Sequence, residues 1–168
     1  MHNGRSKVSR AVTLHKTTQL PISVGRAQKR EVRTQFAALC YRVVKDKPQV
    51  LLVSSRESKR WIVPKGWPMD GKTPAEAAAL EAWEEAGVEG RVRDFVLGIY
   101  SYDKIMPGDS ALPCVVAVFP LKVKRLAPEF PEAGERTRKW FSLKVAATKV
   151  REPELAHVIA RFDPIKLR

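Results

Sequence analysis

Three glutamates lie close together in an alanine-rich segment: Glu81, Glu84 and Glu85. On a helix, at about 100° per residue, their carboxylates fall within an arc of about 100° and form one anionic face. Like charges at this spacing destabilise a helix, and the C-terminal end of a helix dipole disfavours anions. Mg²⁺ or Mn²⁺ would reverse both effects, because hard cations prefer carboxylate oxygens. The spacing therefore predicts a divalent metal site; the alternative is a solvated acidic stripe.

The helix that must carry these glutamates is defined by its ends. Thr73 is a good N-cap, Pro74 suits the first helical position, and Glu76 completes a capping box. Gly87 ends the helix directly after the acidic cluster. Glu76 points away from the other three carboxylates, so we assign it to capping. The opposite side of the wheel is apolar and consists of Ala79, Ala82, Trp83 and Ala86.

The segments around this helix predict a mixed sheet in an α+β or α/β sandwich. Runs rich in strand formers lie at residues 34–44, 49–56, 60–64, 111–126 and 138–143, with one or two more strands within 92–104. The first two flank a turn signal and predict a hairpin, and the apolar run 111–126 predicts a central strand. A loop with two prolines and two glycines, residues 65–74, leads into the helix. Two further helices are predicted at 144–151 and 152–162.

Length and charge set the organisation of the chain. Its 168 residues suggest one folded domain, residues 34–168, behind a basic and flexible N-terminal arm, residues 1–33. The net charge of +13 attracts polyanions such as nucleotides, polyphosphates or nucleic acid. No apolar run is long enough to span a membrane, and the start lacks a secretory signal, so we expect a cytoplasmic protein. A transit peptide is the alternative reading of the arm.

The cysteines and histidines indicate no further metal chemistry. Cys40 and Cys114 lie in apolar strand-like runs, which favours two reduced, packed thiols. The three histidines are scattered, without metal-ligand spacing.

The helix and its preceding loop resemble the Nudix box, G-x5-E-x7-R-E-U-x-E-E-x-G-U, where U is a bulky apolar residue. Gly66 starts the match, and the spacing then holds without a gap through Glu81, Glu84, Glu85, Gly87 and Val88. The flanking segments 49–67 and 136–146 resemble the diphosphoinositol polyphosphate phosphohydrolase branch of that family. The resemblance covers roughly residues 34–150. It implies a Nudix-type α/β/α sandwich around a central mixed sheet.

Two charged positions of the motif are changed, and Ala82 is small for a U position. Lys72 stands where the family has its first glutamate, and Leu80 where it has an arginine that orients the catalytic carboxylates and pairs with an acid. Losing both together avoids a buried charge without a partner, which would be more destabilising than losing the pair. We therefore interpret the box as an accommodated variant that keeps hydrolase activity. What replaces the arginine stays open at this stage.

The resemblance implies metal-dependent hydrolysis of a phosphoanhydride. Glu81, Glu85 and the Gly66 carbonyl would hold Mg²⁺, with Mn²⁺ as an alternative. Glu84 is the expected general base, and Glu81 or a loop acid, Glu129 or Glu132, remain alternatives.

The substrate is expected to be a small polyphosphate, because basic side chains surround the box. Arg60 and Arg136 are further candidates among these cations. By resemblance, the residues that bind polyphosphate oxygens are Ser54, Ser55, Arg56, Lys65 and Arg138. Diadenosine polyphosphates and inositol pyrophosphates both suit such a pocket. The competing hypothesis is a catalytically weakened module that binds RNA or another polyanion. The sequence indicates no oligomeric state.

Overall fold

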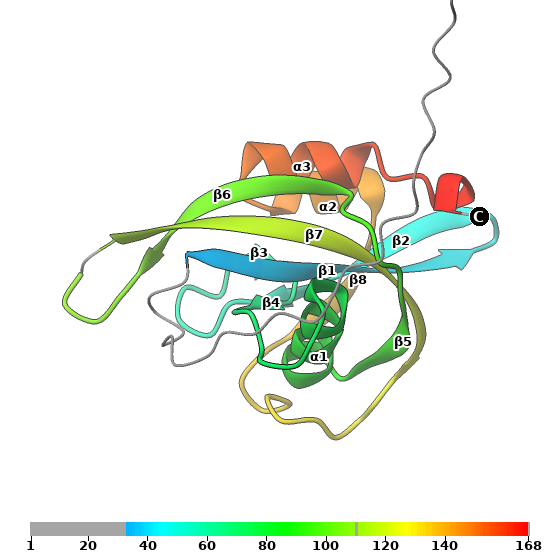
Figure 1. The fold of residues 1–168 in the computed structure, drawn as a ribbon. Helices are drawn as coiled ribbons and strands as arrows, with labels where there is room; N and C mark the ends of the chain where they lie inside the picture. Colours follow the sequence, from blue (N-terminus) through cyan, green and yellow to red (C-terminus); the bar gives the residue numbers. More distant parts are fainter. Residues whose placement is uncertain (1–32, 110, 168) are drawn as a thin grey trace, which may run out of the picture.

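The computed structural model describes residues 33–109 and 111–167, and an eight-stranded mixed sheet with helices on both faces forms its centre (Figure 1). Helix α1 covers one face, and α2 and α3 cover the other. This arrangement confirms the predicted α/β/α sandwich. The strands are β1 (Thr34–Val44), β2 (Lys47–Ser54), β3 (Trp61–Ile62), β4 (Lys65–Gly66), β5 (Val88–Val92), β6 (Gly98–Ile105), β7 (Ala111–Leu126) and β8 (Arg138–Ser142). The helices are α1 (Pro74–Ala86), α2 (Leu143–Lys149), α3 (Pro153–Ala160) and a final 3-10 turn, η2 (Pro164–Leu167).

Strand β7 is central, as its apolar run predicts. It runs parallel to β1, starting at the pair Thr34↔Val115, and antiparallel to β5 and β6. Strands β1 and β2 form the predicted hairpin. Lys45 and Asp46 have φ values of 49° and 59° in its turn, which matches the type I′ geometry that suits the strand twist.

Strand β1 is buried on both faces of the sheet, which explains its almost continuous apolar run. Phe36, Ala38 and Cys40 belong to the hydrophobic core under α1, whereas Ala37 and Leu39 belong to the core under α2 and α3. Because successive side chains of a strand point to opposite faces, a strand covered on both sides must be apolar at nearly every position.

Helix α1 has the predicted ends. The Thr73 hydroxyl accepts the backbone N–H of Glu76, and the Glu76 carboxylate accepts the N–H of Thr73. Gly87 has φ 61° and donates its N–H to the Trp83 carbonyl. This left-handed conformation favours glycine and ends the helix directly after the glutamates.

One prediction needs correction. The segment 65–74 was predicted as a loop throughout, but Lys65–Gly66 forms the short strand β4, pairing with Phe36 and Ala37 of β1. A strand of two residues is too short to show an alternating pattern in the sequence, so it could not be predicted. The alternative to the predicted metal site, a solvated acidic stripe, does not hold for Glu85, because that residue is buried.

Three further predictions concern the N-terminal arm, the cysteines and membrane-spanning segments. The predicted arm, residues 1–33, lies outside the described residues except for Arg33. Cys40 and Cys114 are free and buried, as predicted. In the described part of the chain, no helix is long and apolar enough to cross a membrane.

Candidate active site

Gly66 and Glu81 meet where β4 faces α1. A side-chain carbon placed on Gly66 would overlap the Glu81 carboxylate. The carboxylate therefore occupies the space that any other residue at position 66 would fill. Its approach to the backbone also places the Gly66 peptide beside an acidic oxygen, the kind of donor that Mg²⁺ prefers.

Glu85 lies one helical turn further along and is buried, with a side chain 8% exposed. Its Oε1 accepts a hydrogen bond from Arg136 Nη2 at 2.8 Å, and its Oε2 accepts the Lys65 backbone N–H at 3.4 Å. Burial raises the pKa of Glu85, and the charges of Lys65 and Arg136 oppose that rise. Removing both cations would therefore favour the neutral acid.

Arg136 belongs to the segment between β7 and β8, and its side chain is 7% exposed. Besides Glu85, it contacts the Glu132 carboxylate through Nε and donates from Nη1 to the Ser54 carbonyl at 3.1 Å. The planar guanidinium is thus held by three separate acceptors. The sequence identified Arg136 as a basic residue near the box, but not as a partner of a box glutamate.

Glu84 is half-buried, and its backbone carbonyl accepts the N–H of Glu132 at 3.1 Å. The same segment is tied to the helix end by the Ala127 N–H, which donates to the Gly87 carbonyl at 2.8 Å. Glu132, one alternative base, is engaged by Arg136, whereas Glu129 is exposed. The predicted role of Glu84 as general base stays a prediction.

The oxygen donors fit a hard divalent cation. Glu81 and Glu85 are carboxylates on one helix, and the Glu81 carboxylate approaches the backbone of Gly66. Over residues 33–109 and 111–167, no three His, Cys, Asp or Glu side chains form a group that could hold a metal ion. Two carboxylates and a carbonyl suit Mg²⁺, which usually keeps several waters.

A cluster of cations lies beside these carboxylates. The Lys65 ammonium lies 5.3 Å from the centre of the Tyr102 ring, and the Arg60 guanidinium 5.9 Å from the same ring. Lys104 lies 5.0 Å from the Trp67 ring. Burial lowers the pKa of Lys65, and the attraction of Glu85 opposes that change. Arg60 is also paired with the Glu152 carboxylate at 2.5 Å, whereas Lys65 places a positive charge next to Glu85. Positive charge at this place would attract a phosphate substrate.

Lys104 and Tyr102 were missed by sequence reasoning. They are two residues apart on β6 and therefore lie on the same face of that strand, which the period-two pattern of the segment could have indicated. Because they are distant from the box along the chain, their contacts with Lys65 and Trp67 are not visible in the sequence.

The residues predicted to bind polyphosphate have different surroundings. Ser54 is buried, and its hydroxyl accepts the Thr137 N–H at 2.8 Å. The Ser55 hydroxyl accepts the Arg60 N–H at 3.1 Å. Arg56 is exposed and lies 3.5 Å from the Glu135 carboxylate.

Arg138 is engaged with the end of α1. It donates to the carbonyls of Ala86 at 2.6 Å and Ala127 at 2.8 Å, and its guanidinium lies 4.8 Å from the Phe130 ring. These contacts give it a structural role at the helix terminus, and its predicted contact with substrate stays a prediction.

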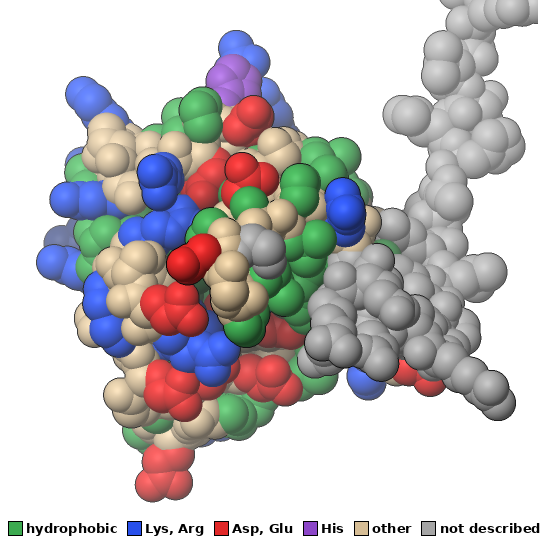
Figure 2. Space-filling model, turned by 90° about the vertical axis from the view of Figure 1, so that its left-hand side faces the viewer, with side chains coloured by type: hydrophobic (Ala, Val, Ile, Leu, Met, Phe, Trp, Pro, Cys, Tyr) green, Lys and Arg blue, Asp and Glu red, His purple; other side chains and the backbone are tan. Residues whose placement is uncertain are grey.

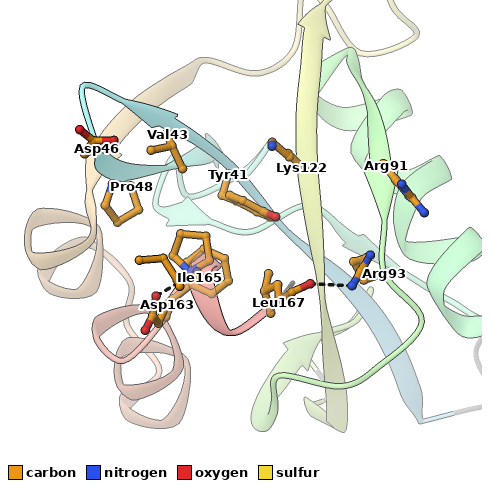
Figure 3. Close-up of a pocket in the computed structure, with 12 residues that line it drawn as sticks. Tyr41, Val43, Asp46, Pro48, Arg91, Arg93, Lys122, Asp163, Ile165 and Leu167 are labelled. Atoms are coloured by element: carbon orange, nitrogen blue, oxygen red, sulfur yellow. Dashed lines mark hydrogen bonds between the residues drawn. The ribbon is translucent and has the colours of Figure 1, made fainter. Parts of the chain in front are cut away.

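A hollow of about 420 Å³ lies elsewhere, between the end of β1 and the C-terminal segment (Figure 3). Its lining includes Tyr41, Lys122 and Arg93, and Arg93 donates to the Leu167 carbonyl at 2.5 Å. Gly66 pairs with Phe36, five residues before Tyr41 on β1, so about 16 Å of strand separates the two places. We place the chemistry at the carboxylates, because this hollow contains none of the box residues.

Charge is mixed over the surface that Figure 2 shows. Acidic and basic side chains lie interspersed on that face of the domain. The net charge of +13 therefore does not appear there as one uniformly basic face.

Comparison with known proteins gives a consistent family. Residues 33–162 match the NUDIX domain family. The chain is 40% identical over 108 residues to a protein of Arabidopsis thaliana named Nudix hydrolase 16, mitochondrial, covering 62% of this chain and 59% of that one. It is 32% identical over 116 residues to diphosphoinositol polyphosphate phosphohydrolase 3-alpha of Mus musculus, covering 68% of this chain and 66% of that one. The chain thus spans about three fifths of the Arabidopsis relative and about two thirds of the mouse one.

Solved structures show the same fold. The crystal structure of an Ap4A hydrolase from C. elegans superposes with a TM-score of 0.59 at 20% identity, covering 82% of this chain and 99% of that one. A NUDIX hydrolase from Nitrosomonas europaea superposes with a TM-score of 0.58, also at 20% identity, covering 76% of this chain and 86% of that one.

Proposed function

Because the chain belongs to the Nudix hydrolase family, we propose that it hydrolyses a phosphoanhydride bond in a polyphosphorylated substrate, in a reaction that requires Mg²⁺. The observation that carries this proposal is the pairing of the Glu81 carboxylate with Gly66, next to the buried Glu85. Nudix hydrolases generally use divalent metal cations.

The metal would be held by Glu81, Glu85 and the Gly66 carbonyl. When bound, Mg²⁺ would neutralise charge that develops on phosphate oxygens and would lower the pKa of a water molecule; Mn²⁺ is the alternative ion. Glu84 would accept the proton of the attacking water as general base. Its backbone carbonyl accepts the N–H of Glu132, which joins this end of the helix to the segment before β8.

Phosphate oxygens would be bound by the cations beside the carboxylates. Lys65, Arg60 and Lys104 gather around Tyr102 and Trp67, where several positive charges lie close to the metal donors. The other proposed ligands of the phosphates are Ser54, Ser55, Arg56 and Arg138. Several cations suit a substrate with more than two phosphates, since each oxygen pair can engage a separate donor.

The names of the relatives support two substrate types. One relative is a diphosphoinositol polyphosphate phosphohydrolase, and one structural neighbour is an Ap4A hydrolase. We therefore propose an inositol pyrophosphate or a diadenosine polyphosphate. The expected cytoplasmic location stays a prediction, and the name of the Arabidopsis relative places that protein in mitochondria. Contact with nucleic acid through residues 1–33 is likewise a prediction.

A substrate panel tests the proposal. The purified chain is incubated with diadenosine polyphosphates, inositol pyrophosphates and nucleoside triphosphates, each with Mg²⁺, with Mn²⁺ or with EDTA, and products are separated by chromatography. Hydrolysis that EDTA abolishes supports the enzyme. Absence of products across the panel, together with salt-sensitive RNA binding, favours the binding module instead.

A further inference from the structure

We propose that Arg136 is the positioning residue that holds Glu85 for the metal, and that it takes over the task of the arginine missing at position 80. This inference rests on the proposed function, because it concerns the same carboxylates. Leu80 has no charge and cannot orient an acid. Arg136 approaches Glu85 from a different part of the chain, 51 residues away.

The contact is a buried ion pair. The side chains of Arg136 and Glu85 are 7% and 8% exposed, and Nη2 lies 2.8 Å from Oε1. Removing one partner of a buried ion pair leaves the other without its counter-charge, so the two side chains hold each other in place. Arg136 therefore fixes the orientation of the Glu85 carboxylate.

The guanidinium is itself fixed. Nε contacts Glu132, Nη1 donates to the Ser54 carbonyl, and Nη2 donates to Glu85. Each of the three guanidinium nitrogens has one acceptor, so the position and the orientation of the planar group are both fixed. A lysine could supply the charge at this place but not the three-way geometry.

The segment that carries Arg136 is joined to both neighbours. The Ser54 N–H donates to the Thr137 carbonyl, and the Thr137 N–H donates to the Ser54 hydroxyl, both at 2.8 Å. These two hydrogen bonds join the residue next to Arg136 to the end of β2. The bond from Glu132 N–H to the Glu84 carbonyl ties the same segment to α1. Arg136 thus spans the gap between the sheet and the catalytic helix.

Glu85 keeps free capacity for a metal. A carboxylate offers about four lone-pair positions, and Arg136 and the Lys65 N–H use one on each oxygen. Arg136 would therefore be a hydrogen-bond partner that orients a metal ligand and leaves that ligand free to bind the metal ion. Loss of such a partner typically weakens metal affinity by about 10- to 100-fold.

The test measures metal binding without substrate. Mn²⁺ affinity is determined by electron paramagnetic resonance for the full chain and for Arg136→Met and Arg136→Lys. We expect Mn²⁺ binding to weaken by about 10- to 100-fold in Arg136→Met, with partial recovery in Arg136→Lys. Arg93→Met is the matched control, since it also removes an arginine that donates to a backbone carbonyl, but away from the box. Its Mn²⁺ affinity should equal that of the unaltered chain.

Folding is checked by circular dichroism. If Arg136→Met does not fold, Glu132→Gln replaces it, because this change loosens the guanidinium at a half-buried position and keeps the Glu85 contact. It should weaken Mn²⁺ binding by less than Arg136→Met would. Unchanged or tighter Mn²⁺ binding in the folded variant overturns the inference, as does a failure of the unaltered chain to bind Mn²⁺.

The two proposals fail differently. Hydrolysis by the unaltered chain, with equal Mn²⁺ affinity in the Arg136 variants, rejects the role of Arg136 and keeps the proposed function. Normal and Arg136-dependent Mn²⁺ binding without any hydrolysis across the panel rejects the function and keeps the role of Arg136.

Discussion

The carboxylate of Glu81 lies against the Cα of Gly66, in the space where any other residue would place its side chain. The relationship joins the first residue of the box to its first helical glutamate. It exists because β4 pairs with β1 on the face of the sheet that α1 covers. A glycine is needed here for close approach, not for an unusual backbone angle.

Gly66→Ala should therefore displace the Glu81 carboxylate. We expect metal affinity to fall by about 10- to 100-fold, with a loss of hydrolysis that added metal partly restores. Titration of activity and of Mn²⁺ binding checks this. Gly134→Ala is the control, because a Cβ there meets nothing within 4 Å. Equal metal affinity in both variants would contradict the proposed contact.

Glu84→Gln and Glu85→Gln should separate proton transfer from metal binding. Loss of a general base reduces turnover by about 10²- to 10⁴-fold, so Glu84→Gln should lower kcat and leave Mn²⁺ affinity almost unchanged. Glu85→Gln should weaken Mn²⁺ binding, because a neutral amide replaces a ligand. Near-normal turnover in both variants would refute the assigned roles.

An arginine restored at position 80 should relieve the dependence on Arg136. Leu80→Arg combined with Lys72→Glu rebuilds the box arginine and its acidic partner. In the Arg136→Met background, we expect this pair to recover part of the lost Mn²⁺ affinity, about fivefold or more, as one regained outer partner would give. The same two changes in the unaltered chain serve as control and should have little effect. No recovery would show that the two arginines do different tasks.

Arg138→Met should destabilise the fold. The change removes two hydrogen bonds from a charged donor to the carbonyls of Ala86 and Ala127. We expect the free energy of unfolding to fall by about 2 kcal/mol or more, measured by denaturant titration. Lys139→Ala, at the exposed neighbouring position, should change stability by about 0.5 kcal/mol or less. An unchanged stability with a raised KM would instead assign Arg138 to the substrate.

The capping box predicts a pH dependence of stability. The hydrogen bond from the Thr73 N–H holds the pKa of Glu76 below its usual range. A carboxyl with a lower pKa in the folded state stabilises the fold above its unfolded pKa, near 4.3. That contribution is lost as the pH falls through the folded value. Glu76→Gln removes the titrating group, so its stability should be lower than that of the unaltered chain at pH 7, and the two should converge once the pH falls below the folded pKa of Glu76. A constant difference between the two would exclude the linkage.

Local signals in the sequence determined the helix and the register of the box. Thr73, Glu76 and Gly87 define the ends of α1 through contacts within a few residues, so the sequence alone predicts them. The apolar runs of β1 and β7 likewise predict buried strands, because burial on both faces leaves few polar positions. The spacing from Gly66 to Val88 was enough to identify the family and, with it, the sandwich and the expected metal donors.

Tertiary structure alone decided how the variant box is supported. Arg136 meets Glu85 only because β8 returns beside β2 and brings the preceding segment over the helix. Lys104 joins Lys65 in the same way, through the pairing of β6 with β7 and of β4 with β1. Such contacts depend on which strands become neighbours, and no local pattern around Leu80 or Lys72 records it. The sequence therefore showed that an arginine was missing, and only the fold showed which residue lies against the carboxylate instead.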